Sequence, residues 1–235
     1  MTMLTTVQRF CRRTGLSVPT TVYGSSDEQV LQILALLEEE GTDLSGRGHW
    51  ERITFEATHT TVATESQGAM NTIASNGYRY IKNETAWDRT ENLPLYIIDG
   101  QDWQAEKGFS TTSPRFRIRV RGGELLATPT PPAGNTWAFE YVSWNWILDD
   151  DGTTYKQYFS EDADEILLPE PIILMGLRWR WKKEKGFDYE EDFNTYETMV
   201  ANELGRQGVK KTLHQDGQPY NRHPHIVVNQ GNWPL

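Results

Sequence analysis

The stretch SSDEQVLQILALLEEEG, residues 25–41, carries the clearest structural signal in the chain. Its apolar residues recur at the helical spacing i, i+3, i+4 and i+7: Val30, Ile33, Leu34 and Leu37. Ser26 stands three residues before Gln29, which is typical of a capping box at a helix start, and Gly41 is expected to end the helix. The three glutamates before Gly41 either face a partner or form a solvated helix end.

Three further helices are predicted, one before this stretch and two in the last third of the chain. The first spans residues 6–14 and ends at Gly15, and the second spans residues 171–185 and is broken by Gly186. One face of the second helix is apolar: Ile173, Leu174, Leu177 and Trp181. The third has an apolar stripe within residues 189–205.

The middle of the chain changes to the period of two that is typical of strands. Four arginines alternate with apolar residues over 115–121: Arg115, Arg117, Arg119 and Arg121. They either bind an anion or a second subunit, or pair with carboxylates on neighbouring strands. Helices at both ends and strands between them predict the α+β class.

A β-hairpin is predicted where two aromatic-rich runs, residues 136–147 and 153–159, flank the acidic turn at residues 149–152. The three aspartates of this turn lack the alternating ligands and distal glutamate of a calcium loop, so we expect a solvated turn. Residues 128–135, rich in proline, are expected to form a loop between strands.

The formal net charge of the 235 residues is −10, and the acidic surplus lies in the middle. Residues 51–170 contain 10 Lys and Arg against 19 Asp and Glu, whereas residues 171–235 contain 9 against 8. Because binding to nucleic acid requires a basic face, this distribution argues against a nucleic-acid clamp. An acidic surface is also explained by solubility alone.

Nine tryptophans in a chain that is only 37% hydrophobic indicate that large aromatic side chains supply much of the core. The single cysteine, Cys11, excludes an intrachain disulfide, and we expect folding in a reducing cytoplasm. The longest apolar stretch, residues 172–177, is far shorter than the roughly 18 residues of a membrane span, and the N-terminus lacks a signal-peptide pattern. We therefore expect neither export nor a membrane partner.

The sequence contains no nucleophile elbow, phosphate loop, dinucleotide turn or zinc-protease helix. We expect a protein that is not an enzyme and that uses no cofactor or metal. His223 and His225 would hold a metal only with a third ligand from elsewhere.

Tryptophans also suggest an alternative function. Four of them could form a sugar-stacking platform: Trp144, Trp146, Trp179 and Trp181. The same arrangement is typical of a core or a subunit interface. If the tryptophans form a sugar-stacking platform, the protein would be a carbohydrate-binding or host-recognition tail module.

The order of these elements is recognisable. Two N-terminal helices are separated by Val18-Pro19 and the run GSSD at 24–27, and Trp50 opens the strand-rich part. The string LPEPIILMGLRWRWK at 168–182 and GFDY at 186–189 follow. Together these features resemble the head-to-tail adaptor proteins of short-tailed and related tailed phages, which form the ring beneath the portal.

The resemblance implies a helical bundle, formed by the N- and C-terminal helices, that carries an inserted antiparallel β-sandwich or barrel-like domain. The boundaries would be 1–48 and 168–207 for the bundle, 49–167 for the insert and 208–235 for an extended C-terminal tail.

It also implies a structural virion protein of the neck or tail, made in the host cytoplasm. Copies would form a ring, commonly of twelve subunits, between the portal and the tail nozzle or head-closure protein, and DNA would pass through the lumen without specific binding. The tail lacks periodicity and would order only against a partner. Its apolar residues are the candidate anchors for that partner: Ile226, Val227, Val228 and Trp233.

Overall fold

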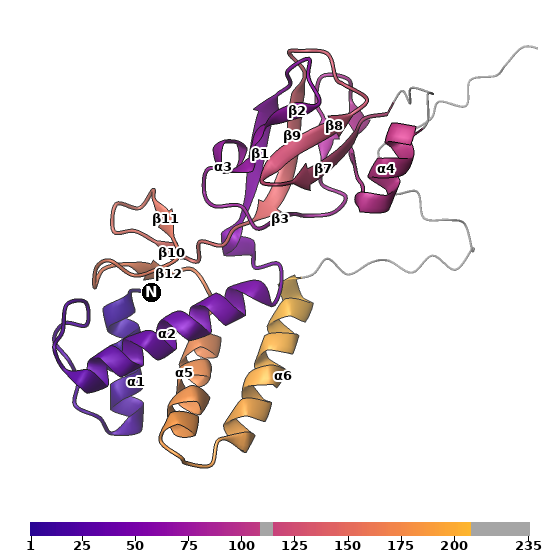
Figure 1. Ribbon diagram of the computed structural model, residues 1–235. Helices are drawn as coiled ribbons and strands as arrows, with labels where there is room; N and C mark the ends of the chain where they lie inside the picture. The colour runs from indigo at the N-terminus through magenta and orange to yellow at the C-terminus, as the bar shows by residue number, and fades with distance from the viewer. Residues whose placement is uncertain (109–114, 208–235) are drawn as a thin grey trace, which may run out of the picture.

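The N-terminal and C-terminal parts of the chain fold together, and the middle part forms a group of strands beside them (Figure 1). The computed structural model describes residues 1–108 and 115–207. Its helices are α1 (Met3–Thr14), α2 (Glu28–Gly46), α3 (Met70–Ile73), α4 (Gly100–Gly108), α5 (Glu170–Glu184) and α6 (Glu190–Gln207), with a 3-10 turn at Glu51–Ile53. Its strands are β1 (Thr54–Thr60), β2 (Ser66–Ala69), β3 (Tyr80–Ile81), β4 (Trp87–Asp88), β5 (Leu93–Pro94), β6 (Tyr96–Ile97), β7 (Arg117–Arg121), β8 (Glu124–Thr128), β9 (Thr136–Val142), β10 (Ile147–Leu148), β11 (Tyr155–Lys156) and β12 (Glu165–Ile166). The predicted α+β class is confirmed.

Helices α1, α2, α5 and α6 form what we call the helical unit, with α5 in contact with each of the other three. The predicted apolar face of α5 is buried in it: Ile173, Leu174, Leu177 and Trp181. Phe10 of α1 meets Trp181 edge to face, with 5.9 Å between the ring centroids. The predicted bundle of N- and C-terminal helices is therefore confirmed.

A small sheet of strand order β11-β10-β12 packs on the helical unit. Trp146, Ile147 and Ile166 belong to the same buried cluster as the helices. This sheet falls inside the predicted insert, 49–167, yet its side chains complete the helical core. The predicted boundaries themselves stay a prediction.

The starts and ends of the N-terminal helices follow local chemistry. Gly15 takes a left-handed conformation, φ 72°, directly after α1, as predicted. The predicted capping box at Ser26 is wrong, because the Asp27 side chain caps α2 by accepting a hydrogen bond of 2.9 Å from the backbone N–H of Gln29.

The prediction that Gly41 ends the second helix is also wrong, since α2 continues to Gly46. Gly41 is buried under the Trp146 ring, and a Cβ atom added there would lie 2.2 Å from the Cη2 of Trp146. The glycine therefore serves close packing inside the helix rather than its termination.

Two larger sheets form what we call the β unit. One has the order β1-β9-β4-β5 with β3 also paired to β9, and the other has the order β2-β8-β7-β6. Side chains of both sheets share a second buried cluster, which includes Trp137, Phe139, Ile118 and Leu125. The arrangement is sandwich-like. Among the described strands β1, β5, β2 and β6 are sheet edges, so no barrel closes, and the β6–β7 pair is parallel, which corrects the prediction of a wholly antiparallel insert.

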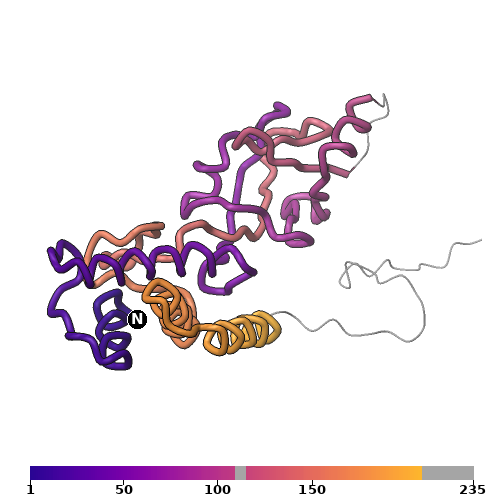
Figure 2. Tube along the Cα trace, turned by 60° about the horizontal axis from the view of Figure 1, so that its bottom comes forward, coloured from indigo at the N-terminus to yellow at the C-terminus, as the bar shows by residue number. Residues whose placement is uncertain are grey.

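The predicted hairpin forms only near its tip. β10 pairs with β11 in antiparallel register across the acidic turn, as predicted. The first aromatic run does not make one strand, because β9 pairs with β1 in the β unit and the chain then crosses to the helical unit before β10. In both views the β unit stands beyond the C-terminal end of α2, away from α1 (Figures 1 and 2).

No helix within residues 1–108 and 115–207 combines the length and the apolar character needed to cross a membrane.

The packing of Gly41 gives a direct test. Gly41→Ala should lower the free energy of unfolding by about 1–3 kcal/mol, because the new methyl group overlaps the Trp146 ring and forces the core apart. The matched control is Gly205→Ala in α6, where an added Cβ meets no atom within 4 Å, and it should gain about 0.5–1 kcal/mol from helix propensity. Urea unfolding of both variants measures the difference. Equal effects of the two substitutions would contradict the packing described here.

Candidate functional site: an ionic junction of three helices

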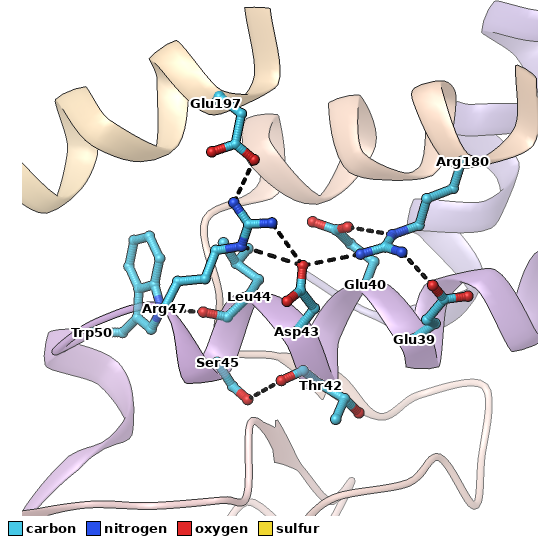
Figure 3. Close-up of polar contacts among 10 residues, drawn as sticks. All are labelled: Glu39, Glu40, Thr42, Asp43, Leu44, Ser45, Arg47, Trp50, Arg180 and Glu197. Atoms are coloured by element: carbon cyan, nitrogen blue, oxygen red, sulfur yellow. Dashed lines mark hydrogen bonds and ion pairs between the residues drawn. The ribbon is translucent and has the colours of Figure 1, made fainter. Parts of the chain in front are cut away.

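The densest polar contacts of the helical unit lie where the C-terminal half of α2 meets α5 and α6 (Figure 3). Glu39, Asp43 and Arg47 are four residues apart, so they share one face of α2. Arg180 comes from α5 and Glu197 from α6. We call these residues, together with Glu40, the ionic junction.

Arg180 binds three carboxylates of α2 and is only 7% exposed. Its Nε donates to Glu40 Oε2 at 2.8 Å, and its Nη2 donates to Asp43 Oδ2 at 3.1 Å. Its Nη1 donates to Glu39. The guanidinium carbon also lies 4.5 Å from the centroid of the Trp179 ring. These contacts fix the rotation of α5 against α2.

Arg47 links α2 to α6. Its Nη2 donates to Asp43 Oδ2 at 2.9 Å and its Nη1 donates to Glu197. The guanidinium lies 5.2 Å from the centroid of the Tyr196 ring, also on α6. Because Asp43 accepts from both arginines, the contacts of α5 and α6 with α2 belong to one network (Figure 3).

Glu40 is the buried centre of the junction, with no exposed surface. Its carboxyl group lies against α5 at Gly176, where an added Cβ would stand 2.1 Å from the carboxyl carbon. Glu40 Oε1 and the Tyr196 hydroxyl are both buried and interact with each other, and neither makes a hydrogen bond to any other group of the described residues. Burial raises the pKa of Glu40 above its ordinary value, and the hydrogen bond from Arg180 opposes that rise. Burial and the charge of Glu40 raise the pKa of Tyr196.

The glutamates before Gly41 were expected to form a solvated helix end or to face a partner, and this is wrong for Glu40, which is fully buried and binds Arg180 of the same chain. Glu39 also pairs with Arg180, but its side chain is 60% exposed and therefore solvated. The sequence signal for this was a charged residue at an apolar position, since Arg180 follows Leu177 by three residues and Glu40 follows Leu37 by three. A buried ion pair of this kind adds little net stability, because the cost of removing both charges from water offsets much of their attraction.

The side chains of the ionic junction hold helices together. Its carboxylates are turned to arginines, and no cluster of metal-ligating side chains occurs in residues 1–108 and 115–207. The junction adds the Arg47–Glu197 ion pair to the packing of α6 on α5, where the Trp179 ring meets the rings of Tyr189, Phe193 and Tyr196. Residues 208–235 follow α6 in sequence, so the junction sets the point from which they depart.

The candidate anchors predicted from sequence lie in that segment: Ile226, Val227, Val228 and Trp233. They fall outside the described residues, as do His223 and His225. The structure therefore neither brings them to a site nor separates them.

The predicted tryptophan platform does not form. Trp146, Trp179 and Trp181 are buried in the helical core, at 0%, 7% and 7% exposure. Only Trp144 is exposed, at 44%, and the Arg79 guanidinium covers it at 4.3 Å from the ring centroid. A single covered ring offers a sugar little surface for stacking.

The arginine strand agrees only in part with the prediction that its side chains pair with carboxylates on neighbouring strands, and the alternative of an anion or subunit contact stays a prediction. Arg121 faces Glu124 on the neighbouring strand, as cross-strand pairing requires. Arg117 pairs instead with Glu106 of α4, and Arg115 donates to the Tyr96 hydroxyl at 3.1 Å. Ile118 on the opposite face is fully buried, so the alternation of apolar and cationic faces is confirmed.

The acidic turn is solvated, as predicted. Asp151 is exposed and accepts hydrogen bonds from the backbone N–H groups of Thr153 and Thr154. The hydrogen bond that the Thr154 hydroxyl donates to Asp151 is the largest cause of the lowered pKa of this carboxyl group, and the two backbone bonds lower it further. The neighbouring Asp149 accepts from Lys156 at 2.8 Å.

A scan against known protein families and a search of curated proteins found no match to this chain. Its function is therefore inferred from sequence pattern and geometry.

The buried carboxyl group of Glu40 predicts a pH dependence. Because its pKa is raised on folding, its contribution to stability is fully present below its ordinary pKa of 4.5 and is lost as the pH rises through the raised value. Glu40→Gln does not titrate. The free energy of unfolding of the wild type, relative to that of Glu40→Gln, should therefore fall as the pH rises above about 4.5. Urea unfolding at a series of pH values measures it, and a difference that stays level or grows with pH would contradict the assignment.

Proposed function

We propose that this chain is a head-to-tail adaptor, a structural protein of a phage virion that joins the portal to the tail. Copies form a ring, commonly of twelve subunits, whose helical units meet the portal and whose opposite end meets the tail nozzle or head-closure protein. The chain is made in the host cytoplasm and resides in the neck or tail of the particle. It acts by binding and positioning and not by catalysis.

The observation that carries the proposal is the construction of the helical unit. The N-terminal helices α1 and α2 share one core with the C-terminal helices α5 and α6. The β unit is formed by the part of the chain between α2 and α5 and stands beside this core (Figure 1). This is the arrangement that the resemblance to phage adaptors implies. The β unit is thereby held at one end of a rigid helical body, as a subunit that bridges two partners requires.

The junction supports a role for the segment after α6. Arg47 and the contacts of Tyr196 hold α6 against α2, so residues 208–235 start from a fixed position in every copy of a ring. Apolar side chains near the end of that segment suit an anchor on a neighbouring ring, where ordering is offset only by binding. Tryptophan is frequent at such binding hot spots, which favours Trp233.

Charge supports a conduit. Residues 51–170, most of which form the β unit, carry almost twice as many acidic as basic side chains. Surfaces of the same sign as DNA leave no deep binding wells along its path, so DNA can traverse the lumen without being retained.

Electron microscopy of the purified chain mixed with its portal protein tests this function. The expected result is a ring on the portal, with a matching loss of complex when residues 208–235 are removed or Trp233→Ala is introduced, because the anchor is then missing. The control is Trp144→Ala, which removes an exposed tryptophan between β9 and β10 and should leave the complex intact. A wild-type chain that stays monomeric and never joins the portal would overturn the proposal.

A further inference from the structure

Strand β1 is the longest edge strand of the two larger sheets. It pairs with β9 along all seven of its residues, and no described strand pairs with its other side. The other edges of these sheets are short or interrupted: β5 and β6 have two residues each, β5 contains Pro94, and the register of β2 with β8 shifts after Ser66. A long open edge is a template on which a further strand can add.

Every second residue of β1 directs its backbone groups away from β9. Residues that bond to the partner strand alternate with residues that do not in an antiparallel pair. In this pair the Thr61 N–H donates to the Asn135 carbonyl at 2.8 Å, so the odd-numbered residues of β1 bond to β9. Glu56, Thr58 and Thr60 therefore direct their N–H and C=O groups to the open edge.

These outward backbone groups make no hydrogen bond within residues 1–108 and 115–207. Buried backbone groups are nearly always paired, so the outward groups face solvent, in agreement with the exposure of Glu56, Thr58 and Thr60. The short helix α3 contacts β1, but among the described residues no hydrogen bond joins the two. Glu56 pairs with Arg89 and so does not guard the edge with a free charge.

The C-terminal end of α6 lies beside the start of this edge strand. Gln207 is the last described residue, and its side-chain Oε1 accepts a hydrogen bond of 3.3 Å from the backbone N–H of Glu51, three residues before β1. Gln207, Leu204 and Thr54 also line one hollow. Residues 208–235 therefore continue the chain from the base of β1.

One run within residues 208–235 has the composition of a strand. Ile226, Val227 and Val228 are consecutive β-branched residues, the type that is enriched in strands. Eighteen residues separate Gln207 from Ile226, which gives an extended reach of about 60 Å. The seven residues of β1 span about 24 Å, so its whole edge lies within that reach.

Charge favours the middle of the chain as the binding surface for this segment. Residues 208–235 contain three Lys and Arg against one Asp. Residues 51–170, most of which form the β unit, contain 10 Lys and Arg against 19 Asp and Glu. Residues 1–50 and 171–207, which form the helical unit, contain 10 against 13. A basic segment is therefore attracted more strongly to the β unit than to the helical unit.

We propose that residues 226–228 add as a strand to the open edge of β1 in the same chain. Main-chain hydrogen bonds to the added strand then satisfy the outward groups of Thr58 and Thr60. The same chain supplies the strand because a tethered segment is present at an effective concentration on the order of millimolar, well above that of a second copy in dilute solution. The inference goes beyond the adaptor function, and it leaves Trp233, five residues after Val228, for the neighbouring ring.

Residue-resolved hydrogen exchange of the free, full-length chain tests this contact. In the wild type the outward amides of Thr58 and Thr60 should be protected, as are the odd-numbered amides that bond to β9. Val227→Pro removes an N–H from the added strand, so exchange of the two outward amides should rise about tenfold or more while the odd-numbered amides stay protected. The matched control is Thr212→Pro, in the same segment but outside the β-branched run, which should change neither set.

Thr58→Pro tests the edge from the side of the β unit. Proline is tolerated in an edge strand where its missing N–H faces outward, so the pairing of β1 with β9 is kept. The amides of residues 226–228 should then exchange about tenfold faster or more. Thr58→Val keeps both the N–H and a β-branched side chain and should preserve their protection.

Three results would overturn the inference. Outward amides that exchange freely in the wild type would show an uncovered edge, and protection that survives Val227→Pro would show that another segment covers it. Protection that grows with protein concentration would assign the strand to a second copy. Because these measurements use the free chain, their failure leaves the adaptor function standing, whereas a chain with the expected protection that never joins the portal overturns the adaptor and supports this inference.

Discussion

The buried guanidinium of Arg180 is the constraint on which the arrangement of the helices depends. A charge removed from water must be paired, and Arg180 meets that demand only where α2 places Glu40 and Asp43 beside it. Asp43 then also binds Arg47, which reaches α6 through Glu197. Arg180 thus fixes α5 against α2, and the shared Asp43 connects this contact to the Arg47–Glu197 ion pair with α6.

Small residues make this possible. Gly176 lets the Glu40 carboxyl group lie on the backbone of α5, and Gly41 lets the Trp146 ring lie on α2. The second of these contacts anchors the segment that returns from β9 to the helical core, because Trp146 lies in that segment. Three of the nine tryptophans pack against a glycine or an arginine: Trp146 on Gly41, Trp144 under Arg79 and Trp179 beside Arg180.

Sequence periodicity predicted the four helices of the helical unit well, since each buries one regular apolar stripe. The prediction for Gly41 was wrong. A glycine was expected to end the helix because of its conformational freedom, but here it is needed because it has no side chain and so leaves room for the Trp146 ring. The ionic junction was not predicted, because charged residues such as Glu40 and Arg180 are usually exposed. Their pairing becomes evident only when α2 and α5 lie side by side. Strands of two residues, such as β4 and β10, are too short to show a period, so the topology of the β unit could not be predicted.

Hydrogen exchange of an Arg180→Met chain tests most directly whether the junction positions α6. Removing one partner of a buried pair costs about 3–5 kcal/mol, and here that loss falls on the helical unit. We expect faster amide exchange across α6 and the C-terminal half of α2, with unchanged protection in β1, β9, β7 and β8. Equal protection of α6 in the variant and the wild type, or a uniform loss over both units, would contradict the account.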